Sequence, residues 1–203
     1  MKKVDHDLRR AEVAEAAAKL IAKKGLTGLT TRALAKSMGC SIGVLSHYFN
    51  SKEQIVQAAF DWADTRLDIR MADVMDQNPT IDSFLPVIEA GLPLDETRDI
   101  EWRVRFNLYN HMLTSGDLVG QREKLQAYRT LLFELLKELK SNGGIRQDID
   151  PALIANTAFD LVVGTAQNLL MIPMEERERH AASIFSIVEN LRPDVTLSQR
   201  NKP

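Results

Sequence analysis

The polar and ionisable side chains best suited to binding are close in sequence, between Leu29 and Lys52. This stretch reads LTTRALAKSMGCSIGVLSHYFNSK and combines hydroxyl groups, an imidazole, a phenol and three Lys or Arg cations. Such groups donate hydrogen bonds to phosphate oxygens and to the edges of bases. The stretch therefore indicates recognition of a nucleic acid.

Two short helices must position these groups. Thr30 is expected to cap a helix over 31–38 that Gly39 ends in a sharp corner, and Ser41 to cap a second helix over 42–49. The inner faces are expected to consist of apolar residues: Leu34, Ala35 and Met38 in the first helix, and Val44, Leu45 and Phe49 in the second. Two short helices around a tight turn predict a helix-turn-helix, whose second helix enters the major groove of DNA.

Longer helices are expected on both sides of this motif. The first covers Asp7–Lys24 and ends at Gly25. Its buried stripe is expected to be Val13, Ala17, Leu20 and Ile21. The next starts at Ser51, which has capping-box spacing to Gln54, and links two domains. Lys52, in its first turn, opposes the helix dipole unless a bound phosphate reverses the balance, so it is either a phosphate clamp or an ordinary solvated lysine.

The charge of the chain is divided unevenly. The net charge is −2, but residues 1–60 hold ten Lys or Arg against five Asp or Glu, whereas the remainder holds 16 against 23. A basic first part suits contact with phosphates, because neutralisation by Lys and Arg supplies most nonspecific affinity for DNA. The alternative is that this asymmetry arose by chance.

The rest of the chain also has helical periodicity, with no convincing alternation of the strand type. Further helices are expected at about 80–90, 96–114, 117–141, 151–171 and 175–191. The fold class is therefore all-α: an N-terminal three-helix DNA-binding domain over 1–52, and a larger helical regulatory and dimerisation domain over 53–194 whose first helix is the linker. Residues 195–203 are expected to be a disordered tail.

Enzymatic and metal-binding sites are not expected. Ser46 and His47 are adjacent, so on a helix their side chains point about 100° apart and do not form a nucleophile and base pair. The four histidines are dispersed, a single Cys40 makes neither a disulfide nor a zinc site, and there is no phosphate-binding glycine loop. We expect no cofactor, no metal, no secretion signal and no membrane span.

The motif resembles the TetR family, whose DNA-binding pattern is similar to T-T-x-x-(I/L)-A-x-x-x-G-x-S-x-G-x-(L/I)-Y-x-(H/Y)-F-x-S-K. The positions in register are Thr30, Thr31, Leu34, Ala35, Gly39, Ser41, Gly43, Leu45, Phe49, Ser51 and Lys52. Ser46 departs from the pattern, because most members have a phosphate-contacting tyrosine there. The string Ser-His-Tyr-Phe at 46–49 resembles the choline-responsive, BetI-like branch of the family.

The resemblance implies which residues meet DNA. Thr31, Tyr48 and Lys52 are expected on phosphates, and Ser46 is a shorter donor than the usual tyrosine. Nearer to base edges we expect Arg32, Ile42, Gly43 and His47, and the full set of expected contacts adds Ser41. Leu45 and Phe49 are read as core, and Tyr48 has the alternative of packing inside with its hydroxyl at the surface.

The resemblance also implies a homodimer, a small-molecule inducer and a cytoplasmic location. The last two helices are expected to pair across a twofold axis, with packing inside one chain as the alternative. The inducer, whose identity is open, is expected among aromatic and polar residues. The candidates are Trp62, Trp102, Arg105, Phe106, Asn107, Tyr109, Asn110, His111, Phe159 and Asp160.

Together these observations predict a ligand-responsive transcriptional regulator, read as a repressor, that binds a near-palindromic double-stranded DNA operator as a dimer and is released by its inducer. The alternative is a helical adaptor or ligand-binding protein without DNA binding. A steep dependence of DNA affinity on salt distinguishes the two, because only the regulator releases counterions from DNA.

Overall fold

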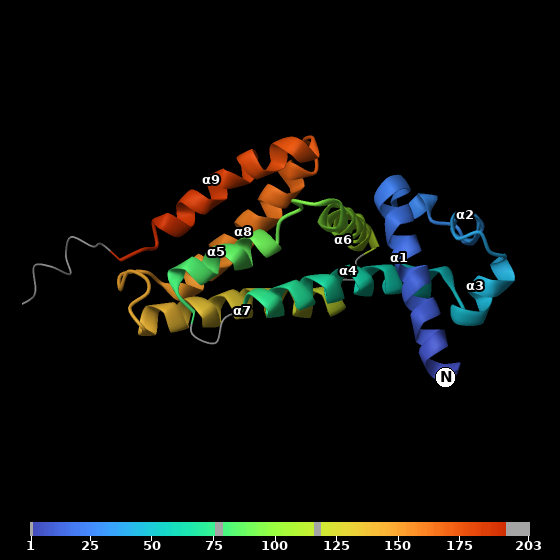
Figure 1. Cartoon of the computed structure of the whole chain (residues 1–203), viewed down its shortest axis with the longest axis horizontal. Helices are drawn as coiled ribbons and strands as arrows, with labels where there is room; N and C mark the ends of the chain where they lie inside the picture. The colour runs from blue at the N-terminus through green and yellow to red at the C-terminus, as the bar shows by residue number, and fades with distance from the viewer. Residues whose placement is uncertain (1, 76–78, 116–118, 194–203) are drawn as a thin grey trace, which may run out of the picture. The chain divides into compact units, whose positions relative to one another are not determined.

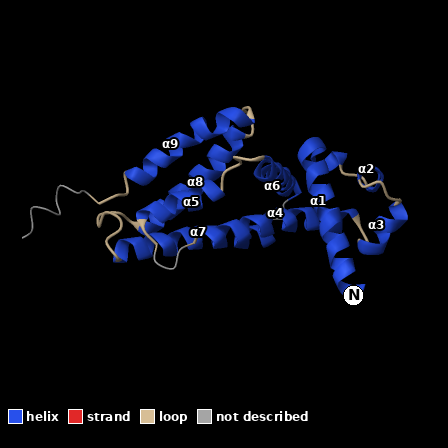
Figure 2. Cartoon of the chain, in the orientation of Figure 1, coloured by secondary structure: helices blue, strands red, loops and turns tan. Residues whose placement is uncertain are grey.

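The computed structural model describes residues 2–75, 79–115 and 119–193, and within these ranges every regular element is a helix (Figures 1 and 2). The expected all-α fold is confirmed. In chain order the elements are α1 (Lys2–Gly28), α2 (Thr31–Ser37), α3 (Ile42–Tyr48), α4 (Lys52–Val74), α5 (Ile81–Ala90), α6 (Glu96–Ser115), α7 (Val119–Ser141), α8 (Pro151–Leu169), the 3₁₀ turn η1 (Met174–Glu176) and α9 (Arg177–Glu189). The tail expected over 195–203 lies outside the described residues.

The chain folds as two compact units. The first consists of 1–69 and 95–117, and the second of 70–94 and 118–203. The division passes through α4 and places α6 with the N-terminal helices, whereas the sequence suggested a boundary after residue 52. That boundary, which separates the helix-turn-helix from its linker, stays a prediction.

The first unit is built around α1. This helix packs against α2, α3 and α6, and the residues expected to form its buried stripe are all buried: Val13, Ala17, Leu20 and Ile21. Leu34 of α2, Leu45 of α3 and Phe60 of α4 join the same core. Full burial of one such side chain contributes about 1.5–3 kcal/mol, so the short helices gain most of their stability from this shared core.

Two glycines shape the chain in the first unit. Gly25, with φ 70° and ψ 176°, interrupts α1 at the predicted end, and three further residues continue the element to Gly28. Gly39, with φ 64°, makes the corner between α2 and α3. Both adopt positive φ, which costs other residues energy because of their Cβ atom. The start of α1 at Lys2 is earlier than the expected Asp7.

The caps of the short helices differ from each other. Thr30 caps α2 as predicted, because its hydroxyl accepts a hydrogen bond from the Ala33 amide at 3.1 Å. Ser41 occupies the N-cap position of α3, as predicted, but its side chain makes no capping hydrogen bond. The Ser41 hydroxyl is exposed and available to another acceptor or donor.

The start of α4 is capped nearly as predicted. The Ser51 hydroxyl accepts from the Gln54 amide at 3.3 Å, and the Gln54 side chain accepts from the Asn50 amide at 2.9 Å. The reciprocal pair is therefore present, but the second bond reaches one residue further back than in a standard capping box.

The second unit is a separate helical packing. Here α7 packs on α8, and α9 packs on both α5 and α8 around a core that includes Phe84, Leu136, Ile145 and Leu169. Asp150 caps α8 by accepting from the Ala152 amide at 2.9 Å, as the Asp-Pro pair predicted. The last helix was expected from Glu175, but a 3₁₀ turn precedes α9. None of the described helices has the length and apolarity needed to cross a bilayer.

Candidate nucleic-acid interface

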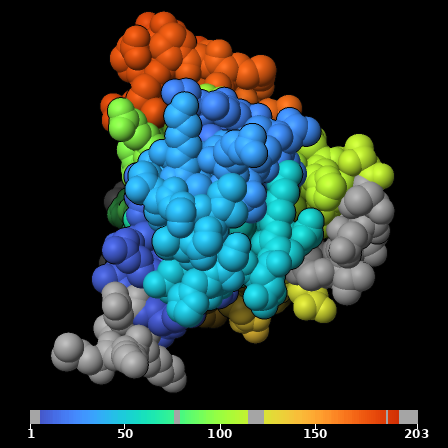
Figure 3. Space-filling view, turned by 90° about the vertical axis from the view of Figure 1, so that its right-hand side faces the viewer, coloured from blue at the N-terminus to red at the C-terminus, as the bar shows by residue number. Residues whose placement is uncertain are grey.

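The corner formed by α2 and α3 presents one face to the core and the other to solvent. Leu34, Leu45 and Phe49 are buried, with exposed fractions of 0%, 1% and 4%, as predicted. Val44 was expected to be core but is 45% exposed, because it precedes Leu45 by one position and therefore points about 100° away from the core. Figure 3 shows the outer surface that these two helices form, in blue to cyan.

The predicted DNA-contacting residues come from α2, α3, the corner between them and the first turn of α4. All of them except Tyr48 are exposed, and Tyr48 is half-buried; the exposed set is Thr31, Arg32, Ser41, Ile42, Gly43, Ser46, His47 and Lys52. Ile42 is exposed at 44%, which is unusual for a large apolar side chain on a helix that also contributes to a core. The sequence-based set is thus available to a partner as one group.

Ser46 and Tyr48 are held by local contacts. The Ser46 hydroxyl donates to the Ile42 carbonyl at 3.2 Å, which orients it along α3 and leaves its oxygen as an acceptor. The Tyr48 ring packs beside two imidazoles, with centroid distances of 4.7 Å to His6 and 5.0 Å to His47. Tyr48 therefore has neither a fully buried nor a fully exposed ring.

The C-terminal end of α3 is held by α1. The Arg10 guanidinium donates to the Tyr48 carbonyl and lies 4.4 Å from the centre of the Phe49 ring. A cation at a helix C-terminus satisfies carbonyls that have no partner within the helix and favours the helix dipole. Arg10 was not among the predicted site residues, because a basic residue on an exposed helix face carries no distinguishing pattern.

Lys52 makes a contact that the sequence did not suggest. Its ammonium donates to the Leu26 carbonyl at 3.3 Å, and two further N–H donors remain on an exposed side chain. The neighbouring Glu53 has a pKa below its usual range, mainly because its own backbone amide and the Ser51 hydroxyl donate hydrogen bonds to the carboxylate. The first turn of α4 thus holds a carboxylate beside the expected phosphate clamp.

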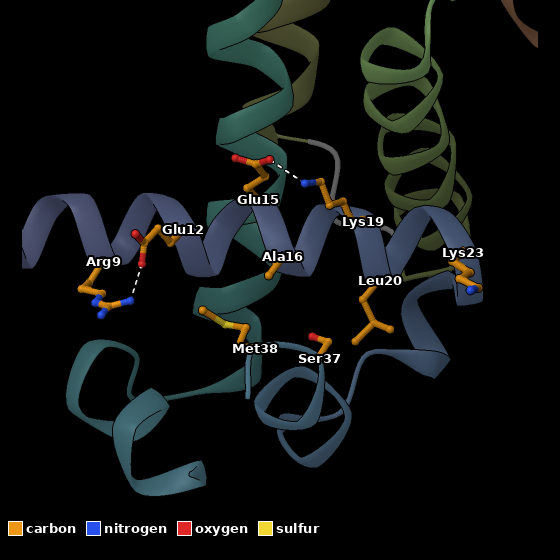
Figure 4. Close-up of a pocket in the computed structure, with 9 residues that line it drawn as sticks. All are labelled: Arg9, Glu12, Glu15, Ala16, Lys19, Leu20, Lys23, Ser37 and Met38. Carbon is orange, nitrogen blue, oxygen red and sulfur yellow. Dashed lines mark hydrogen bonds and ion pairs between the residues drawn. The ribbon is translucent and has the colours of Figure 1, made fainter. Parts of the chain in front are cut away.

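Two surface grooves border the helix-turn-helix. One, with a volume of about 520 Å³, lies between α1 and α2 (Figure 4), and its cations are largely paired: Arg9 with Glu12 at 2.6 Å and Lys19 with Glu15 at 2.7 Å. The other, of about 320 Å³, is lined by Arg10, Tyr48, Asn50, Gln54, Gln57, Ala58 and Asp61. Two of the three cations that line the first groove, Arg9 and Lys19, are paired with carboxylates, and Lys23 is the third, so most of its positive charge is offset against a phosphate.

The candidate ligand-binding residues of α6 form a cluster inside the first unit. Trp102 and Arg105 are buried, and the rings of Trp102, Phe106 and Tyr109 follow one another at 5.3 and 6.2 Å between centroids. Asn107 is half-buried and donates to the Arg103 carbonyl at 2.9 Å. Asp64 of α4 and Glu101 of α6 are buried with Trp102 and Arg105, and we call these four residues the α6 charge cluster.

Two carboxylates of this cluster were missed by sequence reasoning. The Arg105 guanidinium lies 3.3 Å from Asp64 and 3.8 Å from Glu101, and it also donates to the Ala63 carbonyl at 2.6 Å. Arg105 Nη1 has no hydrogen-bond partner. A signal for Asp64 did exist, because it stands on the buried stripe of α4 four residues after Phe60.

Burial also alters Tyr109. Removal from water raises the pKa of its phenol to about 12, Asp64 adds to that rise, and Arg105 opposes it. Burial disfavours the charged form of a phenol because the phenolate loses its hydration. At neutral pH the ring is therefore neutral and can donate or accept a hydrogen bond.

The remaining ligand candidates are Trp62, Asn110, His111, Phe159 and Asp160. Trp62 is half-buried beneath Arg66, whose guanidinium is 4.7 Å from the ring centre, and Asn110 and His111 are exposed. Phe159 and Asp160 belong to the second unit, where both contact Arg129, at 4.3 and 2.6 Å. Among the residues that the structure describes, no group of three His, Cys, Asp or Glu side chains is arranged to hold a metal ion.

Two family models match the chain. Residues 13–59 match the model of bacterial regulatory proteins of the tetR family, and residues 82–191 match that of the C-terminal part of BetI-type transcriptional repressors. The first match covers the helix-turn-helix and the second covers more than half of the chain.

Curated relatives and solved structures agree with these matches. The regulator PksA of Bacillus subtilis is 25% identical over 94% of this chain and 93% of its own length, and the repressor KstR2 of Mycolicibacterium smegmatis is 29% identical over 72% of each. A regulator from Saccharomonospora viridis, solved with choline, is 18% identical and superposes with a TM-score of 0.77 over 93% of this chain and all of that one.

Proposed function

The chain belongs to the TetR family of bacterial regulatory proteins, and we propose that it represses transcription as a homodimer bound to a near-palindromic operator until a small-molecule inducer releases it. It is a DNA-binding transcriptional regulator and not an enzyme, since the matching families and relatives are regulators. The alternative, a helical adaptor without DNA binding, has no support among these comparisons. Since its operator is bacterial DNA, the proposal places it in the cytoplasm.

The observation that carries the DNA-binding proposal is the divided surface of α3. Leu45 anchors this seven-residue helix in the core while Ile42, Ser46 and His47 face outward. A helix presented in this way has the width of the major groove, and its exposed side chains reach base edges. We propose that Arg32, Ile42, Gly43 and His47 read bases.

The phosphate contacts are proposed from the flanking elements. We propose that Thr31, Ser41, Ser46, Tyr48 and Lys52 contact the backbone, which positions the protein without specifying sequence. Lys52 would exchange its bond to the Leu26 carbonyl for a phosphate, or keep it and use its other donors. Either is possible because the Lys52 ammonium has three N–H donors and is exposed.

The dimer is proposed through α8 and α9. Leu153 at the start of α8 is 63% exposed, and Met171 just after its end is 72% exposed. Apolar side chains at both ends of one helix, with the exposed Gly164 between them, suit close packing against the same helix of a second chain. A twofold dimer presents two heads to half-sites about one DNA turn, or a multiple of it, apart.

The inducer site is proposed at the rings of α6. Aromatic faces beside the carboxylates of Asp64 and Glu101 would suit an organic cation, since a cation is attracted to the face of an aromatic ring. The regulator from Saccharomonospora viridis is in complex with choline, so choline is the first compound to test. Arg105 bridges α6 to α4, so displacement of α6 by a ligand would pull on α4 and thus on the head.

The test is a genome-wide selection of bound fragments with the purified full-length protein, at low and high salt. We expect a near-palindrome whose affinity falls with salt. His47→Ala should cost about 1–3 kcal/mol at one base position, and Lys52→Ala should weaken all sequences alike and lower the salt slope by about 0.9 per head. Lys137→Ala, which removes an exposed cation of α7 paired with Glu134, is the matched control and should change neither.

Two results would contradict the proposal. If no fragment is enriched at either salt concentration, the protein does not bind an operator. If choline and other cations leave operator affinity unchanged, and Trp102→Ala also leaves it unchanged, the α6 rings are not the inducer site.

A further inference from the structure

The start of α1 lies against the DNA-facing end of α3. The His6 ring is 4.7 Å from Tyr48 and 5.8 Å from His47, centroid to centroid. His47 is in turn 5.0 Å from Tyr48, so three rings from two helices form one cluster. We call these three residues the histidine cluster.

This cluster adjoins the surface already proposed to meet DNA. His47 is exposed, and His6 and Tyr48 are half-buried, so each keeps part of its ring in solvent. A duplex that contacts Tyr48 and His47 also lies close to His6, because the His6 ring is the direct neighbour of both.

The charged and titratable groups near His6 come from α1, α3 and α4. Arg10 lies one turn along α1 and holds the Tyr48 carbonyl. From α3 the facing titratable groups are His47 and Tyr48, and from α4 the carboxylate of Asp61 lines the groove that Arg10 and Tyr48 share. Asp61 accepts from the Gln57 amide at 2.9 Å. No other carboxylate is recorded in this groove among the described residues.

We propose that His6 is part of the DNA interface and contacts the phosphate backbone beside Tyr48 through its imidazole. This inference rests on the proposed operator binding. Histidine is the side chain whose charge ordinarily changes between pH 5 and 8, so a histidine against phosphates makes affinity rise as pH falls. The repressor would then hold its operator more tightly in acid.

The experiment measures operator affinity of the full-length protein against salt, at about pH 5.5 and about pH 8. At the lower pH, His6→Ala is expected to weaken binding a few-fold and to lower the salt slope by about 0.9 per head, because one phosphate neutralisation is lost. At the higher pH the slope should be the same as in the wild type.

Two further variants separate charge from packing. His6→Phe keeps an aromatic ring against Tyr48 without a charge, and His6→Lys supplies a charge without the ring. We expect His6→Phe to behave like His6→Ala in salt slope, and His6→Lys to retain the higher slope at both pH values. Lys19→Ala removes a cation of the same helix that is paired with Glu15, and should leave the slope unchanged.

The outcomes distinguish the two proposals. If the wild type binds its operator and every His6 variant has the wild-type slope at both pH values, this inference is wrong while the proposed function stands. If His6→Phe restores binding and His6→Lys does not, His6 only packs against Tyr48. If the wild type binds no DNA, the proposed function itself fails.

Discussion

The surface of α3 and the α6 charge cluster contain similar residue types but differ in their exposure to solvent. Both contain aromatic rings and ionisable side chains within one unit, and both were singled out from the sequence as binding regions. On α3 the polar groups are exposed and make few contacts, whereas on α6 Arg105 and Glu101 are 3% and 0% exposed. Polar residues at a helical spacing thus do not distinguish an exposed polar surface from a buried group of ion-paired side chains.

The difference has an energetic basis. Exposed side chains on α3 keep their hydration until DNA displaces it, so they add little to the stability of the free protein. Arg105 has lost its water and depends on Asp64, Ala63 and Glu101 to replace it. Substitutions in the two regions should therefore separate cleanly into losses of binding and losses of stability.

Arg105→Ala should have the largest effect. It leaves two carboxylates buried without their guanidinium, which costs about 3–5 kcal/mol of unfolding free energy. The measurement is urea unfolding followed by helical circular dichroism. Arg103→Ala, two residues earlier on α6, removes a partly exposed guanidinium held by Asp99 at 2.6 Å and should cost about 1 kcal/mol or less. Equal losses of unfolding free energy for the two variants would show that a buried guanidinium contributes no more to stability than a partly exposed one.

Leu45→Ala against Val44→Ala tests the two faces of α3. Leu45 is 1% exposed, so its truncation should cost about 2–5 kcal/mol. Val44 is 45% exposed, so its truncation should change the unfolding free energy by about 0.5 kcal/mol or less. The same unfolding experiment measures both. A large loss for Val44→Ala would show that the expected inner face, and not the observed one, is correct.

The pH dependence of stability should report Tyr109. Its pKa is raised by burial to about 12, so the folded state holds the proton more tightly than the unfolded state does. The resulting stabilisation is complete below about pH 10 and is lost as pH rises toward about 12, amounting to about 3 kcal/mol. Tyr109→Phe should remove this part of the alkaline loss. Identical alkaline curves for both proteins would mean that the phenol is not buried as described.

The same contrast explains which features the sequence could predict. The approximate helix spans, the corner at Gly39 and the buried stripe of α1 follow from local periodicity and from a residue that tolerates positive φ. They were confirmed, except that α1 begins earlier than expected and a 3₁₀ turn precedes α9. The site residues on α2 and α3 followed from a family pattern. Their exposure agrees with it, while their contacts with DNA remain predictions.

Long-range partners could not be predicted in this way. Asp64 meets Arg105 across 41 positions and His6 meets Tyr48 across helices, and no local pattern encodes either contact. Val44 was misplaced because a seven-residue helix has too few turns for its apolar positions to define one face. Ser41 is the N-cap residue of α3 as predicted, but the sequence preference for serine at this position does not show whether its hydroxyl forms the capping bond.

The smallest effect, and the finest test of the comparison, is at the two caps. Thr30→Ala removes a capping bond of 3.1 Å and should cost about 1 kcal/mol of unfolding free energy. Ser41→Ala removes no capping bond, so stability should be unchanged while operator affinity falls if the hydroxyl meets phosphate. Thermal unfolding and operator titration of both variants measure the two quantities. If Ser41→Ala instead lowers stability and leaves operator affinity unaltered, the Ser41 hydroxyl stabilises the helix and does not contact DNA.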